Sequence, residues 1–435
     1  MNKGWLTMKR RDFLKQSFIM GAAGLIAPVP KVYSASADGY SGRLLVTLQV
    51  DGGWDVTSFC DPKMNVAGER EINSWANTAE TQTAGNLSYA PFADNAAFFD
   101  KYYQDMLIIN GVDAQTNSHS TGVLHNWSGR NSAGYPSITA MFAAHNAPDQ
   151  PLSYINSGGF AYTADLIRFS RLEDPDALRQ LLVPEKESDE VYIRSPSDMA
   201  RIREYRNQRH TRLLSDPGII NRYQENLAAY DSALRSKSSL SDFENFIPAN
   251  EDIEPNEQII PQVNSDLKRQ MQMALAAFSG GICSSADLFT RGYDTHGDHD
   301  ALHASLFSHL TDSIDFFWTS AETAGLADRI TLLIGSDFGR TPNYNSDMGK
   351  DHWPIGSFIV MESSPSWGNR VVGETDEGHN AYAINPSTLL RDDDNGTVIY
   401  PAHFHKAFRR YLGLEGSSVD QDFQFLTTED FDFFG

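Results

Sequence analysis

The sequence predicts an α/β protein with a doubly wound, mostly parallel sheet, helices on both faces and a helical insertion. Three observations lead to this fold class. Several short, continuous apolar runs have the length and the β-branched content of buried strands. Two of these runs flank a long amphipathic pattern, which makes a strand–helix–strand crossover unit. Polar residues follow the ends of the runs, as in open parallel sheets, where ligands bind beyond the carboxyl ends of the strands.

Five apolar runs are the expected strands, and one amphipathic segment is the expected crossover helix. The runs lie at 43–50, 105–112, 286–290, 329–335 and 356–362. Between the third and fourth runs, apolar residues recur at three- and four-residue steps, at Leu302, Leu306, Leu310, Ile314 and Phe317. Asp298 or Asp300 is placed to cap the start of this helix, and Gly325 its end. The strands on either side should be parallel and neighbouring.

Residues 38–435 are predicted to form a single domain around this sheet. A mainly helical insertion is expected at about 165–270, because residues 196–237 are rich in polar helix formers and poor in β-branched residues. The acidic segment 241–261 is interrupted by prolines and predicts a loop. The last sixteen residues alternate acids with Phe, which favours a strand or loop fixed to the core over a docking peptide.

Residues 1–37 have the pattern of an export signal. Basic residues at 9–11 precede an apolar stretch, and residues 35–37 read Ala-Ser-Ala, a typical cleavage site. The Arg10-Arg11 pair, followed by Phe, Leu and Lys at 13–15, resembles the twin-arginine signal. The apolar stretch is shorter than the ~18 residues that a membrane span needs. We therefore expect a periplasmic or extracellular mature protein without a membrane span.

Length, charge and cysteine content limit the class of protein further. A chain of 435 residues is long enough to bury a sizeable core. Its 57 acidic and 35 basic residues give a formal charge of -22, which repels nucleic acid and anionic lipid. Nucleic acid is not expected as a partner, and an anionic substrate would need local cations. Whether Cys60 and Cys283 pair stays open, although two small buried apolar side chains is the favoured interpretation.

Polar side chains follow four of the expected strands and should meet at one edge of the sheet. In chain order they are Asp51 and Asp55, the segment Asn-Ser-His-Ser-Thr at 117–121, Asp294 and His296, and Asp337 and Arg340. Any one of them could simply close a turn. Crowded carboxylates repel one another, however, and a divalent cation is the commonest compensation. Mixed Asp and His ligands suit Zn, Mn or Fe, so Zn or Mn is expected rather than Ca or Mg.

The segment GYDTHGDHDALH, which begins at Gly292, carries the densest group of candidate ligands. Asp294 and His296 leave the expected strand and alternate to the same side, so they are the favoured ligands. The acids and histidines from Asp298 to His303 are expected at the helix start and on its solvated face. His352, beside Asp351, is a further candidate. The candidate metal ligands are Asp51, Asp55, His119, Asp294, His296, Asp337 and His352.

Five segments resemble, in order, the motifs of a bacterial exported family called domain of unknown function 1501. They read LLVTLQVDGGWD, GYDTHGD, LLIGSDFGRTP, DHWP and GNRVVGETDEG. The family reads GG-x-D, then G-W-D-T-H, then S-E-F-G-R-T, then G-x-D-H-G, and belongs to the alkaline phosphatase and sulfatase superfamily. The resemblance spans about Leu44 to about Leu414. It implies an alkaline phosphatase-like core with metal ligands at strand ends, and in the hydrolytic members a Ser, Thr or modified Cys nucleophile.

The resemblance also implies roles for individual residues. Asp51 resembles the superfamily's first-strand metal aspartate, and Asp55 the acid of GG-x-D. Asp294 and His296 match D-T-H, whereas Asp351 and His352 match D-H. Asp337 and Arg340 stand at the Glu and the Arg of S-E-F-G-R. The segment TNSHSTG lies where the superfamily places its nucleophile, which makes Ser118 the first candidate and Ser120 the second.

Two departures from the superfamily leave the number of metals open. Phe338 stands where the phosphatases carry a histidine ligand, and the C-x-P-S-R segment of the sulfatases does not occur. The expected function is nevertheless an exported, metal-dependent hydrolase of phosphate or sulfate esters. The metal would polarise the ester oxygen and lower the pKa of Ser118 or a water, while Arg340 would neutralise charge on the transferred group.

Two alternatives to the hydrolase remain open. One is a non-catalytic periplasmic or surface protein that binds a metal or a glycan and assists an exported assembly. The other is a purely structural α/β protein with solvated acidic loops. A fold by itself does not decide activity. The expected partner is an anionic ester or a glycan, and the sequence leaves the natural substrate and the oligomeric state open.

Overall fold

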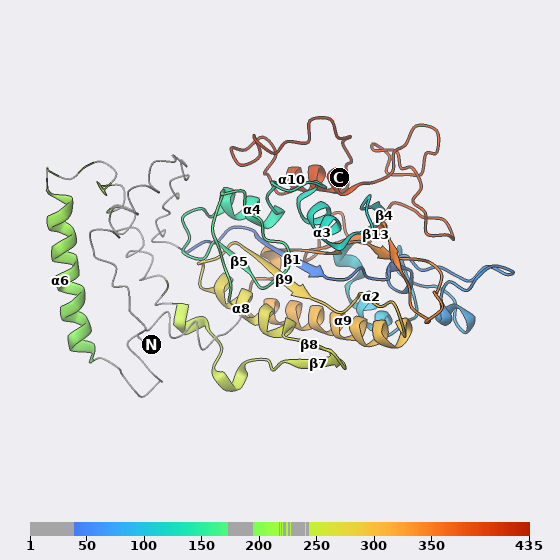
Figure 1. Ribbon diagram of the computed structural model, residues 1–435, viewed down its shortest axis with the longest axis horizontal. Coiled ribbons are helices and arrows are strands. Elements are labelled where there is room, and N and C mark those ends of the chain that lie inside the picture. The colour runs from blue at the N-terminus through green and yellow to red at the C-terminus, as the bar shows by residue number, and fades with distance from the viewer. Residues whose placement is uncertain are drawn as a thin grey trace, which may run out of the picture. The chain divides into compact units, whose positions relative to one another are not determined.

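An eight-stranded sheet organises the computed structural model, which describes residues 39–172, 195–216 and 243–435 and a few single positions between 218 and 240. The strand order is β14-β4-β13-β10-β1-β9-β5-β6. Neighbouring strands are parallel throughout, except that β13 runs antiparallel to both β10 and β4. The predicted α/β class with a mostly parallel sheet is therefore confirmed (Figure 1).

All five predicted strands are present, with ends within one residue of the expected ones. The strands of the sheet are β1 (Leu44–Val50), β4 (Met106–Asp113), β5 (Tyr154–Asn156), β6 (Phe169–Ser170), β9 (Ser285–Thr290), β10 (Ile330–Ser336), β13 (Ile355–Met361) and β14 (Arg370–Val372). Short two-stranded pairs are β2 (Gln82–Ala84) with β3 (Leu87–Tyr89), β7 (Glu257–Ile260) with β8 (Val263–Ser265), and β11 (Gly339–Arg340) with β12 (His352–Trp353). The apolar runs thus located the strands well.

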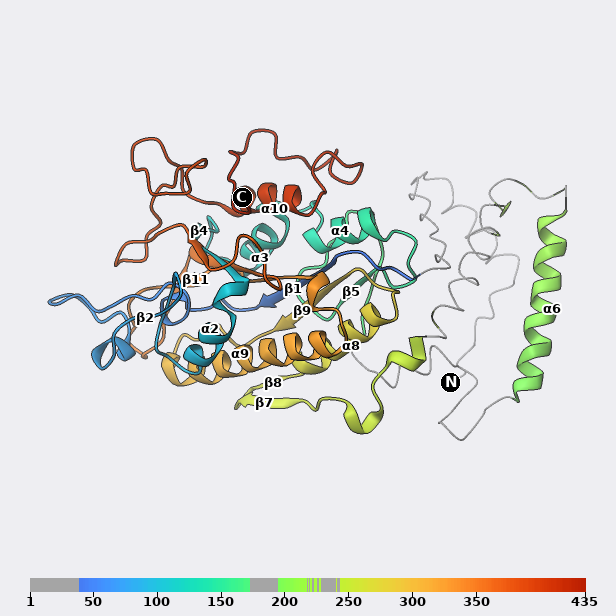
Figure 2. The same ribbon diagram turned by 180° about the vertical axis from the view of Figure 1, so that it is seen from behind.

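Helices cover both faces of the sheet, because successive strand residues point to opposite sides. The even-numbered residues of β1 pack in one core with α2 (Asn95–Tyr102), α8 (Leu267–Ser279) and α9 (His299–Thr323). Leu45 packs in the opposite core with α3 (His119–Ser128), α4 (Ile138–Asn146) and α10 (Pro401–Tyr411). Figures 1 and 2 show these two helical layers on either side of the strands. The doubly wound arrangement is confirmed.

The order of the central strands differs from the sequence-based expectation. β9, α9 and β10 form the predicted crossover unit, and its two strands are parallel. They are not neighbours, because β1 lies between them and pairs with both. Every residue of β1 is buried, which suits a strand covered on both faces and paired on both sides. The prediction of neighbouring strands was therefore wrong.

The direction of β13 places its first residues at the edge of the sheet where β1, β4, β9 and β10 end. We call this edge the functional edge, because the candidate site residues follow these strands. β1, β4, β9 and β10 run parallel to one another, so their carboxyl ends meet at one edge. β13 runs the other way and pairs Ile355 with Asp113 at the end of β4. The residues that precede β13 therefore lie where the other four strands end. This topology brings His352 to the side chains that follow those strands.

The start of α9 differs from the sequence-based expectation in one respect. Asp298 is the N-cap residue, but its φ is 48° and its side chain makes no capping hydrogen bond. At the other end, Gly325 follows the C-cap and has a φ of 67°, as expected for a helix terminator. His299 and His303 were expected on a solvated face. Both are buried, because they face the turn that follows β1 rather than solvent.

Several predicted segments fall partly or wholly outside the described residues. The export signal at 1–37 lies outside them, as does much of the insertion expected at about 165–270. The described part of that range contains α6 (Pro196–Leu214) and the β7–β8 pair. The loop expected at 241–261 contains two single 3-10 turns and all of β7. Among the described residues, no helix is both long and apolar enough to cross a membrane.

The cysteines and the C-terminal segment take the favoured places. Cys60 and Cys283 are buried and unpaired, as small apolar side chains. Phe431 and Phe433 are buried in the core that contains α10. The alternation of acids and Phe therefore fixes this segment to the body of the protein.

Candidate metal centre

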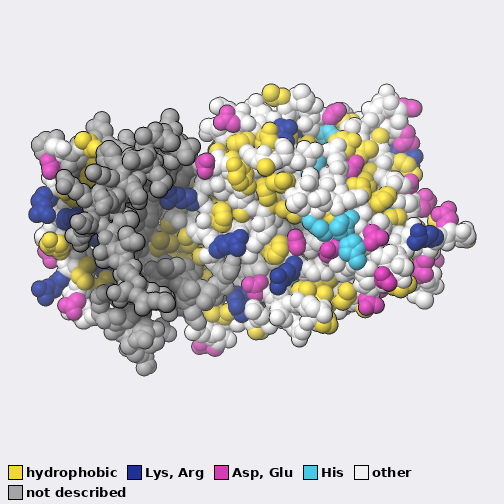
Figure 3. All heavy atoms as spheres, viewed as in Figure 1, with side chains coloured by type: hydrophobic (Ala, Val, Ile, Leu, Met, Phe, Trp, Pro, Cys, Tyr) yellow, Lys and Arg dark blue, Asp and Glu magenta, His cyan; other side chains and the backbone are white. Residues whose placement is uncertain are grey.

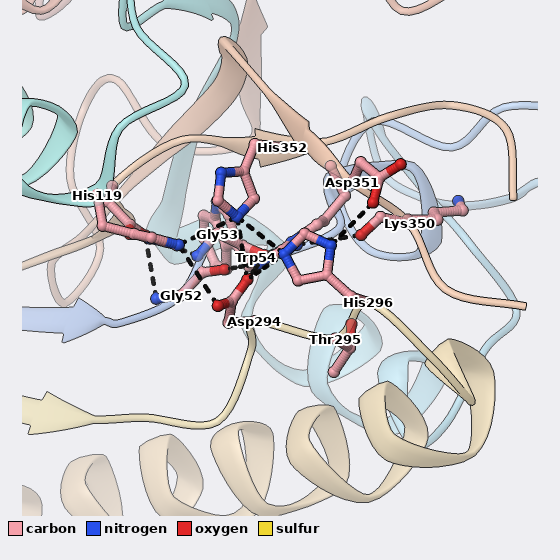
Figure 4. Close-up of polar contacts among 12 residues, drawn as sticks. Gly52, Gly53, Trp54, His119, Asp294, Thr295, His296, Lys350, Asp351 and His352 are labelled. Atoms are coloured by element: carbon pink, nitrogen blue, oxygen red, sulfur yellow. Dashed lines mark hydrogen bonds and ion pairs between the residues drawn. The ribbon is translucent and has the colours of Figure 1, made fainter. Parts of the chain in front are cut away.

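Imidazole and carboxylate groups from three segments face a common space at the functional edge of the sheet. His119 begins α3, Asp294 and His296 follow β9, and His352 precedes β13. The nearest oxygen or nitrogen atoms of His119, Asp294 and His352 all lie within 4.8 Å of one another. Figure 4 shows these side chains pointing toward one another, and Figure 3 shows a group of histidines at the surface with acidic side chains beside it. The predicted convergence of distant polar residues is present.

The distances within this group are short enough for its atoms to bind one metal ion together. His352 Nε2 lies 3.1 Å from His119 Nε2 and 3.1 Å from His296 Nε2. Asp294 Oδ1 lies 3.1 Å from His352 Nε2 and 3.0 Å from His296 Nε2. Asp294 Oδ2 lies 3.5 Å from His119 Nε2. We call His119, Asp294, His296 and His352 the metal group.

The outward-facing nitrogens of the three histidines decide what the inward-facing ones can do. His352 Nδ1 donates to the carbonyl oxygen of Asn117 at 2.8 Å, and His296 Nδ1 lies 2.8 Å from Asp351 Oδ1. His119 Nδ1 contacts Asp337 Oδ2. A neutral imidazole that donates from Nδ1 has a bare lone pair on Nε2. Three bare Nε2 atoms beside a carboxylate repel one another unless a cation lies between them, so the donor set fits a divalent metal.

Arg340 binds Asp294 from the buried side of the metal group. Its side chain is fully buried. Nε donates to Gly53 O at 2.8 Å, Nη1 to Lys350 O at 3.0 Å, and Nη2 to both Gly52 O and Asp294 Oδ1. Burial opposes ionisation of Asp294, but Arg340 outweighs it and holds the pKa of Asp294 at about 2. The direct contact with a transferred group expected for Arg340 does not fit this arrangement, because the side chain is fully buried and four of its five N–H hydrogens already have acceptors.

Asp337 orients His119 instead of pointing into the metal group. Its Oδ2 contacts His119 Nδ1, while its Oδ1 accepts from the amides of Gly52 and Gly53 at 3.1 and 2.6 Å. Both glycines have positive φ, 114° and 79°, which turns their amides toward this carboxylate. The GG pair after β1 therefore supports the site through Asp337.

Asp51 lies beside the metal group with its carboxylate available. It is half-buried, and no hydrogen bond to its side chain is found within the described ranges. Burial raises the pKa of Asp51, and the nearby Asp337 carboxylate raises it further, whereas His119 and, to a smaller extent, Arg291 lower it. The crowding of carboxylates expected from the sequence is thus present at the end of β1.

Asp55 is not brought to the metal group. Its Oδ2 lies 2.8 Å from Lys350 Nζ and 2.9 Å from His299 Nε2, and its Oδ1 accepts from the Thr57 hydroxyl at 2.6 Å. Burial opposes its ionisation, but the Lys350 ammonium outweighs burial and holds the pKa of Asp55 well below its usual range. The acid of GG-x-D thus belongs to a separate buried network. It does not take the ligand role that was expected for it.

The candidate nucleophiles border the metal group. Ser118 is exposed and is the N-cap residue of α3, between Asn117, which holds His352, and His119. Its hydroxyl lies 3.2 Å from that of Ser120. Phe338 closes another side of the group, with ring centroids 4.7 Å from His119 and 4.8 Å from His352. An apolar ring thus stands at the place of the histidine that the superfamily pattern expects.

The family model described as "Protein of unknown function (DUF1501)" matches residues 43–392. The chain belongs to this family. The match covers the strands, turns and loops that build the metal group, and it confirms the resemblance carried by the five motifs. No curated protein matches this DUF1501 chain.

Solved structures with a similar fold include members of the alkaline phosphatase superfamily. A protein of that superfamily from Vibrio parahaemolyticus is 9% identical, with a TM-score of 0.38 over 94% of this chain and 76% of that one. The phosphonate monoester hydrolase of Agrobacterium radiobacter is 11% identical, with a TM-score of 0.33 over 85% and 74%. The lipoteichoic acid synthase LtaP from Listeria monocytogenes is 9% identical, with a TM-score of 0.34 over 93% and 79%. At such identities the functional argument depends on the site itself.

Sequence reasoning missed the buried residues behind the metal group in this DUF1501 protein. Lys350 directly precedes the D-H-W-P motif, and Thr295 stands between two ligand candidates. His299 and His303 are four residues apart and therefore share one face of α9. That spacing gives no sign of the direction in which this face points. The structure shows that it faces Asp55.

Proposed function

We propose that this DUF1501 protein is a metal-dependent hydrolase of phosphate or sulfate esters. The observation that carries the proposal is the mutual approach of His119, His296 and His352 through Nε2 atoms whose partner nitrogens are held by oxygen acceptors. Asp294 completes the group with a carboxylate. This donor set favours Zn or Mn over Ca or Mg, because imidazole nitrogen suits the former pair. When bound, the metal polarises an ester oxygen and favours the ionised form of a nearby hydroxyl.

Ser118 is the proposed nucleophile, with Ser120 as its neighbour in the hydrogen-bonded pair. Ser118 is exposed and adjoins His119, and its hydroxyl makes no capping hydrogen bond to α3. The ten-residue α3 points its N-terminal amides toward this end, which favours an anionic group there. A phosphoryl or sulfuryl group at the metal group would therefore meet a hydroxyl and a helix N-terminus together.

Arg291 is the proposed cation for the substrate anion, because Arg340 is buried among acceptors. Arg291 directly follows β9, three positions before Asp294, and is exposed. In a chain of formal charge -22, an exposed guanidinium at the site edge offsets the repulsion that an anionic ester would meet. We expect Arg291→Ala to raise KM about tenfold with little change in kcat, as steady-state kinetics would measure. An unchanged KM would remove this residue from the proposal.

Metal analysis and ester turnover test the hydrolase. Purified protein should hold Zn or Mn and hydrolyse 4-nitrophenyl phosphate, bis(4-nitrophenyl) phosphate or 4-nitrophenyl sulfate. Asp294→Asn should lose both metal and turnover, whereas Ser118→Ala should lose turnover and keep the metal. Asp298→Asn is the matched control, because Asp298 is exposed, makes no capping bond and has a φ of 48° that Asn tolerates.

Two outcomes would redirect the proposal. Protein that holds the metal but turns over none of these esters with Zn, Mn or Mg would point to the alternative, a non-catalytic metal-binding or glycan-binding protein. Purified protein that holds no metal would overturn the metal centre itself. We also propose export by the twin-arginine route, supported by the signal pattern at 1–37. Replacing Arg10 and Arg11 with Lys should then leave the protein in the cytoplasm upon cell fractionation.

A further inference from the structure

A closed polar pocket surrounds the ammonium group of Lys350 behind the metal group. Lys350 Nζ lies 2.8 Å from Asp55 Oδ2, 3.1 Å from Thr57 Oγ1 and 2.8 Å from Asn73 Oδ1. All four side chains are fully buried. Three oxygens that converge on one buried positive charge resemble a cation site, with the difference that the cation is covalently attached to the chain. We call Asp55, Thr57, Asn73 and Lys350 the lysine pocket.

Lys350 joins the segments that carry the metal group. Its amide donates to the carbonyl oxygen of Thr295, between Asp294 and His296, at 3.2 Å. Its own carbonyl oxygen accepts from Arg340 Nη1 at 3.0 Å, and Arg340 also holds Asp294. Along the chain, Lys350 is followed by Asp351 and His352. One residue therefore links the turn after β1, the segment after β9 and the segment before β13.

A ring of hydrogen bonds with one consistent direction connects the lysine pocket to Thr295. The amide of Asp55 donates to His303 Nε2 at 3.3 Å, so the hydrogen of His303 is on Nδ1 and is donated to Thr295 Oγ1 at 3.0 Å. The Thr295 hydroxyl can then donate to His299 Nδ1 at 2.7 Å. His299 Nε2 donates in turn to Asp55 Oδ2 at 2.9 Å. Every donor in this ring has an acceptor.

We propose that Lys350 is a positioning residue for the metal group, acting as a tethered cation that fixes the segments 294–296 and 350–352 relative to each other. This inference rests on the metal centre proposed above. Without the ammonium group, the Asp55 carboxylate would stay buried without its counter-charge, and the ring that ends on Thr295 would lose its anchor. The displacement would reach Asp294, His296 and His352, although Lys350 itself contacts no ligand atom.

Removal of the charge at constant length tests the proposal. Lys350→Met should weaken Zn²⁺ binding about 10- to 100-fold, as for other residues that orient metal ligands, and should change the visible absorption of the Co²⁺-substituted protein. Arg409→Met is the matched control, because it breaks a buried ion pair with Asp420 at 3.2 Å that has no contact with the lysine pocket or the metal group. It should lower stability and leave Zn²⁺ affinity and the Co²⁺ spectrum unchanged.

A milder pair of variants covers the case in which Lys350→Met does not fold. Thr295→Val keeps the Asp55–Lys350 pair and the volume of the side chain but opens the hydrogen-bonded ring, so it should also weaken Zn²⁺ binding. Thr295→Ser restores the hydroxyl and should restore the affinity. The proposal is overturned if wild-type protein binds Zn²⁺ and Lys350→Met or Thr295→Val binds it equally well with the same Co²⁺ spectrum. Wild-type protein that binds no metal overturns the proposed function first, and this inference with it.

Discussion

Gly52 lies where the turn after β1 touches the segment that carries Asp294. Its φ is 114°, and a Cβ atom added to it would lie 2.5 Å from the amide nitrogen of Asp294. We expect Gly52→Ala to lower stability and to weaken Zn²⁺ binding about tenfold or more, because Asp294 must move. Gly68 is the control, since its φ is 85° and nothing lies within 4 Å of the added atom. Gly68→Ala should cost about 1 kcal/mol of backbone strain, measured by urea unfolding, and leave metal affinity unchanged.

Asp337 controls the tautomer of His119. In Asp337→Asn, the side-chain oxygen must still accept from the amides of Gly52 and Gly53, so the amide nitrogen would face His119 Nδ1. The hydrogen of His119 would then move to Nε2, which cannot bind a metal in that form. We expect Zn²⁺ affinity to fall about 10- to 100-fold with the fold retained.

Asp351→Asn gives a graded comparison for this prediction. Asp351 holds His296 in the same way, but its side chain is 55% exposed, whereas that of Asp337 is fully buried. Water can replace the lost acceptor at Asp351, so the loss of Zn²⁺ affinity should be smaller. Competition with a chromophoric chelator measures both variants. Equal, undiminished affinities would contradict the orienting role of these carboxylates.

At the scale of single residues, the sequence indicated which residue types gather and not which way they point. Asp51 and Asp55 stand four positions apart after the same strand, yet one borders the metal group and the other is buried against Lys350. The difference arises at Gly52 and Gly53, whose positive φ values reverse the chain between them. Residue spacing carries no record of such a turn, so the two acids were assigned the same role.

At the scale of elements, α3 packs its first turns against the loop that follows β10. A Cβ atom added to Gly122 would lie 2.3 Å from the carbonyl oxygen of Asp337. Within a helix, Gly→Ala ordinarily stabilises by about 1 kcal/mol. Here we expect the opposite sign, because the methyl group would push α3, and with it His119, away from the metal group.

Thermal unfolding and Zn²⁺ titration of Gly122→Ala test this sign. A lower melting temperature together with weaker Zn²⁺ binding would agree with close packing of α3 on the loop. A variant that is more stable than the wild type, with unchanged Zn²⁺ affinity, would contradict it.

The elements themselves could be predicted because burial on both faces leaves continuous apolar runs, as in β1 and β10. Strand order could not, since β1 is apolar enough to pair anywhere in the sheet and only the assembled structure places it between β9 and β10. The reversal of β13 was equally invisible, because an apolar run reads the same in either direction. His352 was therefore recognised as a candidate without a reason for its position.

At the scale of the whole molecule, buried neutral histidines make stability depend on pH. His405 is fully buried and donates from Nε2 to the carbonyl oxygen of Asn126 at 2.8 Å. Burial lowers the pKa of His405 to about 3, against about 6.5 for an unfolded chain. Between these two pH values the unfolded chain binds a proton that the folded chain does not bind. The stability that depends on neutral His405 is therefore fully present above about pH 6.5 and is lost as the pH falls.

We therefore expect His405→Gln to flatten the pH dependence of the unfolding free energy. Relative to pH 7 or above, the proton that binds unfolded His405 lowers the unfolding free energy at pH 5 by about 2 kcal/mol. The variant should not show this loss. His145 is exposed, so His145→Gln should leave the pH dependence as in the wild type. Urea unfolding at pH 7, 6 and 5 compares the three proteins. An equally steep loss in His405→Gln and the wild type would assign the acid sensitivity to other groups.

The central place of β1 has a cost while the protein is being synthesised. Thr47 of β1 and Asp287 of β9, which join by a hydrogen bond of 2.6 Å, are 240 residues apart in the chain. At typical translation rates, a ribosome needs roughly 10 to 50 s to cover that distance. During this interval the nascent polypeptide exposes an apolar strand with two unpaired edges, which is a template for aggregation. Efficient production of this protein should therefore depend on a chaperone that shields residues 44–50 until translation has passed β10.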